Sequence, residues 1–150
     1  LKGTERTTKL ALSLSDPGVV QTFKSRFKEV FNMRKVDYLF CNKEEAISLV
    51  GENFVKDLSS LAVNYVVTNG AESSYISEEG SYAEIKAKSV KAIDSNGAGD
   101  IFAGAALNKI IEGDSFLNAC EFGNYASSII VQEKSPRLSI DQYKKLKADY

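Results

Sequence analysis

Three short apolar segments, separated by helix-type patterns, constrain the fold of this chain more than any other feature. Residues 9–16 alternate leucine with small or polar residues, and residues 36–41 and 64–68 are apolar runs, so all three are predicted to be β-strands. A helix-type pattern lies after each of the first two strands, over 17–31 and 42–51. Because parallel strands need a crossover connection, this order favours an α/β fold.

The remaining segments complete that pattern. Two strand-like runs flank Glu78-Glu79-Gly80 and predict a β-hairpin. Residues 101–111 are apolar on nearly every side, which predicts a buried helix. Further helices are expected over 54–62, 114–132 and 139–149. We therefore expect residues 1–150 to form one α/β domain with a mostly parallel central sheet.

Composition excludes several classes of protein. The chain is 43% apolar and 26% charged, which is ordinary for a soluble globular domain. Its net charge of −1 does not indicate the basic surface that would attract nucleic acid or an anionic membrane. It contains no histidine, which removes Ser-His-Asp and Cys-His catalysis. We read Cys41 and Cys120 as reduced core thiols, and with no signal peptide pattern at the start we expect a cytoplasmic location.

The loop Asp94 to Asp100, with the sequence DSNGAGD, is the strongest candidate for a functional site. Gly97, Ala98 and Gly99 offer little side chain to obstruct a ligand, and they lead into a helix whose first amides have no internal partner. An anion bound there would repel Asp100, so this carboxylate fits the role of a base that takes a proton from an attacking hydroxyl. Taken alone, the loop is also compatible with a simple glycine turn in which Asp100 caps the helix.

Common phosphate-binding fingerprints do not fit this loop. A dinucleotide fingerprint needs a third glycine where Phe102 stands. A P-loop needs a lysine after its second glycine, but Ala105 follows Gly104. Any phosphate site here therefore belongs to another class.

Residues 94–105, DSNGAGDIFAGA, closely resemble the D-T-x-G-A-G-D-x-F motif of the ribokinase-like (PfkB-type) kinases of sugars and nucleosides. Two upstream elements occur in the family's order: Asn42 and Glu45 are similar to its N-x-x-E motif, and Thr68 and Gly70 to its strand-end T-x-G. Asn96 resembles the adenosine kinase branch. The resemblance covers most of residues 9–138.

The resemblance implies a three-layer αβα ribokinase-like fold and transfer of the γ-phosphoryl of ATP to a hydroxyl of a nucleoside or sugar. It implies that Gly97, Ala98 and Gly99 supply an anion hole and that Asp100 is the base. Asn42 and Glu45 are expected to organise Mg²⁺, water and phosphate, with Glu45 as the metal-linked carboxylate. The positions expected to bind the nucleotide are Thr68, Gly70 and Asn124.

Each of these upstream residues has a plainer interpretation. Asn42 could cap the helix after it, and Glu45 could be a solvated helix acid. Thr68 to Gly70 could form an ordinary turn, and Asn124 could face solvent. The use of a monovalent cation such as K⁺ stays open, because Lys134-Ser135-Pro136 stands where many family members have glycine.

Length is the largest departure from the family, whose members run to about twice 150 residues. We therefore expect the C-terminal, nucleotide-binding half of such a kinase, with the lid and the N-terminal half absent. Its partners would be ATP, a nucleoside or sugar, and either the N-terminal half of the same protein or a second copy. An exposed sheet edge or apolar face is expected where that partner packs. The alternative function is a non-catalytic nucleotide- or anion-binding, or structural, module.

Overall fold

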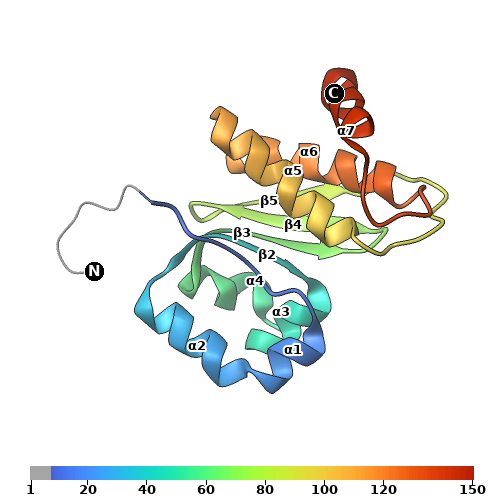
Figure 1. Cartoon of the computed structure of the whole chain (residues 1–150). Coiled ribbons are helices and arrows are strands. Elements are labelled where there is room, and N and C mark those ends of the chain that lie inside the picture. Colours follow the sequence, from blue (N-terminus) through green and yellow to red (C-terminus); the bar gives the residue numbers. More distant parts are fainter. Residues whose placement is uncertain (1–7) are drawn as a thin grey trace.

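A five-stranded sheet forms the centre of the computed structural model, which describes residues 8–150 (Figure 1). The strands lie in chain order: β1 (Ala11–Ser13), β2 (Val36–Asn42), β3 (Ala62–Asn69), β4 (Ser73–Glu78) and β5 (Ser81–Lys86). β1, β2 and β3 pair in parallel, and β4 and β5 are the predicted antiparallel hairpin. Four of the five strands therefore run in the same direction, as the sequence predicted.

Helices cover both faces of the sheet and complete the three layers (Figure 1). One layer holds α1 (Pro17–Thr22), α2 (Lys24–Met33), α3 (Lys43–Val50), α4 (Phe54–Asp57) and the 3₁₀ helix η1 (Leu58–Ser60). The other holds α5 (Ala98–Glu112) and α6 (Phe116–Ile130), with α7 (Ile140–Asp149) outside them. No helix in residues 8–150 is long and apolar enough to cross a membrane.

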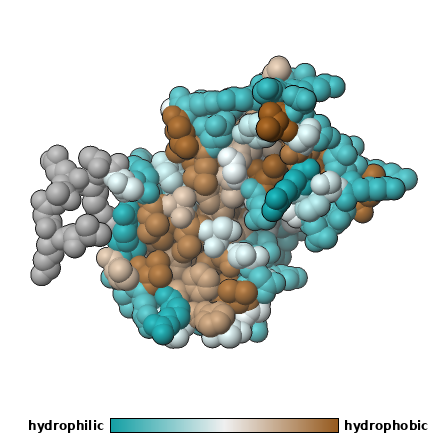
Figure 2. Space-filling view, viewed as in Figure 1, coloured by the Kyte–Doolittle hydropathy of each residue, from teal (hydrophilic) through white to brown (hydrophobic). Residues whose placement is uncertain are grey.

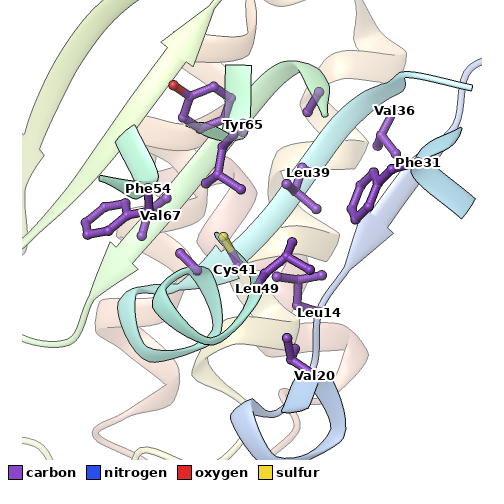
Figure 3. Close-up of a cluster of buried hydrophobic side chains, with 13 residues drawn as sticks. Leu14, Val20, Phe31, Val36, Leu39, Cys41, Leu49, Phe54, Tyr65 and Val67 are labelled. Carbon is purple, nitrogen blue, oxygen red and sulfur yellow. The ribbon is translucent and has the colours of Figure 1, made fainter. Parts of the chain in front are cut away.

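Alternating side chains on β2 and β3 build a separate core on each face. Leu39 and Cys41 of β2 point into the layer of α1 and α3, where Figure 3 shows them facing Leu49 and Leu14. Phe40, between them in sequence, packs on the other face against Phe102 and Phe116. Because both faces are buried, these strands read as continuous apolar runs rather than as alternating ones.

Three expectations about helices were wrong. The pattern over 17–31 predicted one helix, but the chain forms α1 and α2 with a break at Phe23, whose φ and ψ are −111° and 25°. Asp16 caps α1, accepting a hydrogen bond from the Val19 amide. The second error is the single helix expected over 54–62, which is the short α4 followed by the 3₁₀ helix η1, with Ala62 already in β3. The third error concerns α5, which is not buried on all sides because Ile111 is 83% exposed. An apolar composition shows that a helix has apolar faces, but not what covers each of them.

Within residues 8–150, the edge strand β1 leaves alternate backbone groups unpaired. Leu10 O accepts from Tyr38 N, and Leu14 N donates to Phe40 O, so the even-numbered residues face β2. In a parallel ladder the residues between them, Ala11 and Ser13, then direct their amides and carbonyls away from the sheet. Both residues are exposed. The expected open edge is therefore present on β1.

Candidate active site

A small cavity with both polar and apolar walls lies beyond the carboxyl ends of β1, β2 and β3. Its volume is about 70 Å³, which is room for a few water molecules or an ion. Five residues singled out from the sequence line it, from three separate segments: Asn42, Glu45, Thr68, Gly99 and Asp100. The carboxyl ends of parallel strands are where α/β proteins collect their ligand-binding groups.

Asn42 and Glu45 form a reciprocal capping box at the start of α3. The Glu45 amide donates to Asn42 Oδ1 at 2.8 Å, and the Asn42 amide donates to Glu45 Oε2 at 2.9 Å. A third bond, from Asn42 Nδ2 to Glu45 Oε1 at 2.8 Å, fixes the carboxylate in place. The plainer interpretation of Asn42 as a helix cap is therefore correct, and the cap orients Glu45 at the cavity.

Glu45 is not a solvated helix acid, because it is only 5% exposed. Burial raises the pKa of Glu45, and the charges of Asp16 and Glu44 raise it further, while the hydrogen bond from the Asn42 amide lowers it. A cation in the cavity would favour the ionised carboxylate and offset these effects. Cys41 also borders the cavity, but burial raises the pKa of its thiol, which leaves it protonated and unreactive.

The start of α5 is open. Its N-cap is Gly97, in the left-handed conformation with φ 77°, and no side chain caps the helix. The Ala98 amide donates to Ser95 O at 3.2 Å, so this amide is already used. Within residues 8–150 the amides of Gly97, Gly99 and Asp100 have no acceptor. Of the three amides expected to form an anion hole, those of Gly97 and Gly99 are free and that of Ala98 is not, while the amide of Asp100 is free as well.

Two glycines in this loop serve different purposes. A Cβ at Gly97 would lie 2.5 Å from the carbonyl oxygen of Pro136, and the positive φ also favours glycine. Gly97 is therefore required by the fold. A Cβ at Gly99 would meet nothing within 4 Å, so its side faces open space next to the cavity. Asp100, one residue further, is exposed at the rim.

A second, larger cavity lies on the other side of the α5 start. It measures about 300 Å³ and is lined by Gly70, Ala98 and Asn124 among others. Gly70 turns the chain out of β3 with φ 56°. Asn124 is half-buried and donates from Nδ2 to Lys86 O at 3.0 Å, which ties α6 to the end of β5. This volume lies at the lower end of the range for small-molecule sites.

Apart from Gly97, which lines neither, the sequence-predicted residues divide between two cavities. Thr68 borders the small cavity, where its hydroxyl lies 3.5 Å from Cys41 O. Ala98 borders the large one, and Gly99 and Asp100 the small one, so the first turn of α5 lies between them. A ligand that reached both cavities would cross the free amides.

Sequence reasoning missed Ser13 and Ser15, which also line the small cavity. The position of Ser13 depends on the pairing of β1 with β2, which sequence alone does not give. Ser15 adopts a φ of 74°, uncommon for a residue other than glycine, and no local pattern signals it. Asp16 caps α1, and its charge also acts on Glu45.

Comparisons with known proteins place the chain in a family. The model of the pfkB family of carbohydrate kinases matches residues 2–142. The chain belongs to this family. PfkB relatives include adenosine kinase 1 of Arabidopsis thaliana, 28% identical over 140 residues that cover 81% of this chain and 40% of the relative. They also include the ribokinase of Staphylococcus aureus, 32% identical over 116 residues, with coverages of 70% and 38%.

A solved PfkB-type structure matches the fold closely. The crystal structure of adenosine kinase from Sinorhizobium meliloti superposes with a TM-score of 0.86 at 24% identity, covering 95% of this chain and 45% of the other. The ribokinase-like fold is therefore confirmed. The chain spans about 40% of the length of the curated relatives that it matches.

Proposed function

We propose that this chain is the nucleotide-binding part of an ATP-dependent kinase that phosphorylates a hydroxyl of a nucleoside or sugar. The observation that carries the proposal is the small cavity, where Glu45 and Asp100, from distant segments, meet beside the free amide of Gly99. Phosphoryl transfer needs positioning and charge stabilisation more than covalent chemistry, and these three groups supply both.

Asp100 acts as the base in this proposal. It lies at the exposed rim of the cavity, where an acceptor hydroxyl can approach from solvent or from a neighbouring domain. In this step its carboxylate would accept the hydroxyl proton as the oxygen attacks the γ-phosphorus, while the bond from the γ-phosphorus to the β,γ-bridging oxygen breaks and ADP leaves. The positive end of α5 and the amides of residues 97, 99 and 100 stabilise the charge on the equatorial oxygens.

The residues at the small cavity also fit a Mg²⁺ ion held partly through water. The described residues contain no group of three acidic, histidine or cysteine side chains, so a dedicated protein cage for a metal is absent from them. Mg²⁺ is commonly bound by one or two carboxylates together with substrate phosphates. Glu45 supplies the carboxylate and Asn42 holds it in place. The ion would neutralise charge on the transferred phosphoryl group.

The larger cavity fits the nucleoside part of ATP. It adjoins the first turn of α5 and has apolar walls with a few polar groups, including Asn124 and Ser128. A nucleotide seated there would direct its phosphates across the free amides toward the small cavity. We assign Gly70 and Asn124 to the nucleoside and Thr68 to the phosphate side.

We further propose that the remaining part of a PfkB-type polypeptide packs against the open edge of β1. About 60% of the length of the curated relatives has no counterpart in this chain. The unpaired backbone of Ala11 and Ser13 can accept another strand. Beside it, apolar residues on α1 and α2 are exposed, including Met33 at 83%, and Figure 2 shows apolar side chains gathered across this face.

A kinase assay tests the base assignment. This chain would be assayed alone and joined to the N-terminal part of a PfkB-type kinase, with adenosine and ribose as acceptors. We expect phosphorylated product only from the joined protein. Asp100→Asn should then reduce kcat by about 100- to 10,000-fold, because the carboxylate that takes the proton is lost. ATP–Mg binding should stay within about threefold of wild type, since the Asp100 side chain does not bind the phosphates and the substitution keeps the backbone amide of residue 100.

Asp94→Asn is the matched control, because it makes the same chemical change in the same loop. Asp94 Oδ1 accepts a hydrogen bond from the Asn96 amide at 2.9 Å, and an asparagine oxygen can accept it too. We expect this variant to keep most of the activity. Unchanged turnover in Asp100→Asn would refute the base assignment. If the joined protein shows neither turnover nor ATP–Mg binding, the alternative of a structural module is supported. If this chain alone forms dimers, we would assign the edge of β1 to a second copy of the chain rather than to the N-terminal part.

A further inference from the structure

Helices α5 and α6 approach each other at two points one helical turn apart. A Cβ added to Gly123 of α6 would lie 2.9 Å from Phe102 O of α5, so only glycine permits this approach. Four residues further along α6, the Ser127 hydroxyl donates to Ala98 O at 2.9 Å. Residues four apart lie on one face of a helix, so the glycine allows the contact that the serine uses.

Ala98 is the first residue of α5, which places this bond at the open helix start. The other end of the loop is held by the same part of α6. Val131 O, directly after α6, accepts hydrogen bonds from the amides of Ile93 and Asp94. Both ends of residues 94–98 are therefore anchored on the last turn of α6.

Bonds within the loop are local and do not fix its position on the protein. Asp94 accepts from the Asn96 amide, and Ser95 O accepts from the Ala98 amide, so both close short turns. Within residues 8–150, Ser127 is the only side chain outside residues 94–100 that forms a hydrogen bond to them. Its loss would let this glycine-containing loop populate other conformations.

We propose that Ser127 is a positioning residue, which holds the free amides of residues 97, 99 and 100 in the geometry that binds phosphate. The inference rests on the proposed function, because it assigns those amides to the phosphates of ATP. Ser127 also lines the larger cavity, but its hydroxyl donates to Ala98 O, so we assign it a role through Ala98 rather than a bond of its own to the nucleoside or the phosphates. When only a fraction of the protein has the binding geometry, the apparent dissociation constant rises by the inverse of that fraction.

The test compares wild type, Ser127→Ala and Ser127→Thr of this 150-residue chain. Calorimetry measures binding of ATP–Mg and of adenosine, which lacks phosphates. Hydrogen exchange measures protection of the amides of residues 94–101 without nucleotide. Ser127→Ala should weaken ATP–Mg binding by roughly five- to tenfold, the equivalent of one ordinary hydrogen bond, and leave adenosine binding within about twofold. Its loop amides should exchange faster, and Ser127→Thr should restore both properties because it keeps the hydroxyl.

Ser60→Ala is the matched control, because Ser60 also donates to a backbone carbonyl, Asp57 O at 2.8 Å, but lies on the opposite face of the sheet. It should change neither binding nor loop exchange. Ser127→Cys keeps the volume with a weak donor and gives the same test if the alanine variant does not fold. The inference would be overturned if Ser127→Ala bound ATP–Mg with wild-type affinity, or if its affinities for ATP–Mg and for adenosine fell by the same factor. If wild type does not bind ATP–Mg, the proposed function is wrong; unchanged loop exchange in Ser127→Ala would separately refute the positioning role.

Discussion

Two helices start at the same edge of the sheet and border the same cavity, but they treat their first amides differently. The start of α3 is closed by its own side chains, since Asn42 and Glu45 cap each other's backbone. The start of α5 has no side-chain cap and leaves three amides without an acceptor within the described residues. A helix start without partners is costly when it is shielded from water, and it is useful where an anion binds.

The difference assigns a role to each helix. At α3 the cap fixes a buried carboxylate beside the cavity, as a site for a cation requires. At α5 the glycines keep side chains away from the amides, as a site for phosphate requires. Opposite charges of a Mg²⁺–phosphate ligand would thus meet complementary groups on two adjacent helices.

Among substitutions that test the difference between the two helix starts, Gly97→Ala is expected to change stability most. The new Cβ would collide with Pro136 O, and alanine would have to adopt a φ of 77°, so we expect a loss of about 3 kcal/mol in the free energy of unfolding. Urea denaturation measures it. Gly99→Ala is the control: its Cβ meets open space, so stability should stay unchanged or rise by up to about 1 kcal/mol. The Gly99 variant should nevertheless bind ATP–Mg more weakly. Equal stability of the two variants would contradict the separate roles of these glycines.

A smaller effect on stability is expected at the start of α3, where the free energy of unfolding should depend on pH through Glu45. The pKa of Glu45 is raised above its ordinary value of 4.5 in the folded protein, so folding favours its protonated form. Stability from this group is therefore present below pH 4.5 and is lost as pH rises through the raised pKa. Glu45→Gln should make the free energy of unfolding depend less on pH above 4.5, with a change smaller than that of Gly97→Ala.

Urea denaturation of Glu45→Gln between pH 4 and pH 8 measures this dependence. Glu44→Gln is the control, because Glu44 is exposed in the same helical turn and should keep most of the wild-type profile. Identical pH profiles for wild type and Glu45→Gln would show that the carboxylate at the cavity is not buried as described.

The sequence predicted much of this contrast because its determinants are local. The DSNGAGD loop and the Asn42–Glu45 spacing each lie within a few residues, and the apolar runs gave β2 and β3 directly. What it could not supply depends on how segments meet. The hydrogen bond of Ser127 needs the register of α5 on α6, and the place of Ser13 needs the pairing of β1 with β2. The exposure of Ile111 depends on what covers α5.

Nuclear magnetic resonance of the backbone amides during an ATP–Mg titration tests the central claim most directly. We predict saturable shifts for the amides of Gly97, Gly99 and Asp100, because these donors gain phosphate acceptors. The amide of Glu45, which already donates to Asn42, should shift far less. Saturable binding that leaves the amides of residues 97, 99 and 100 unchanged, or the absence of any binding, would contradict the account.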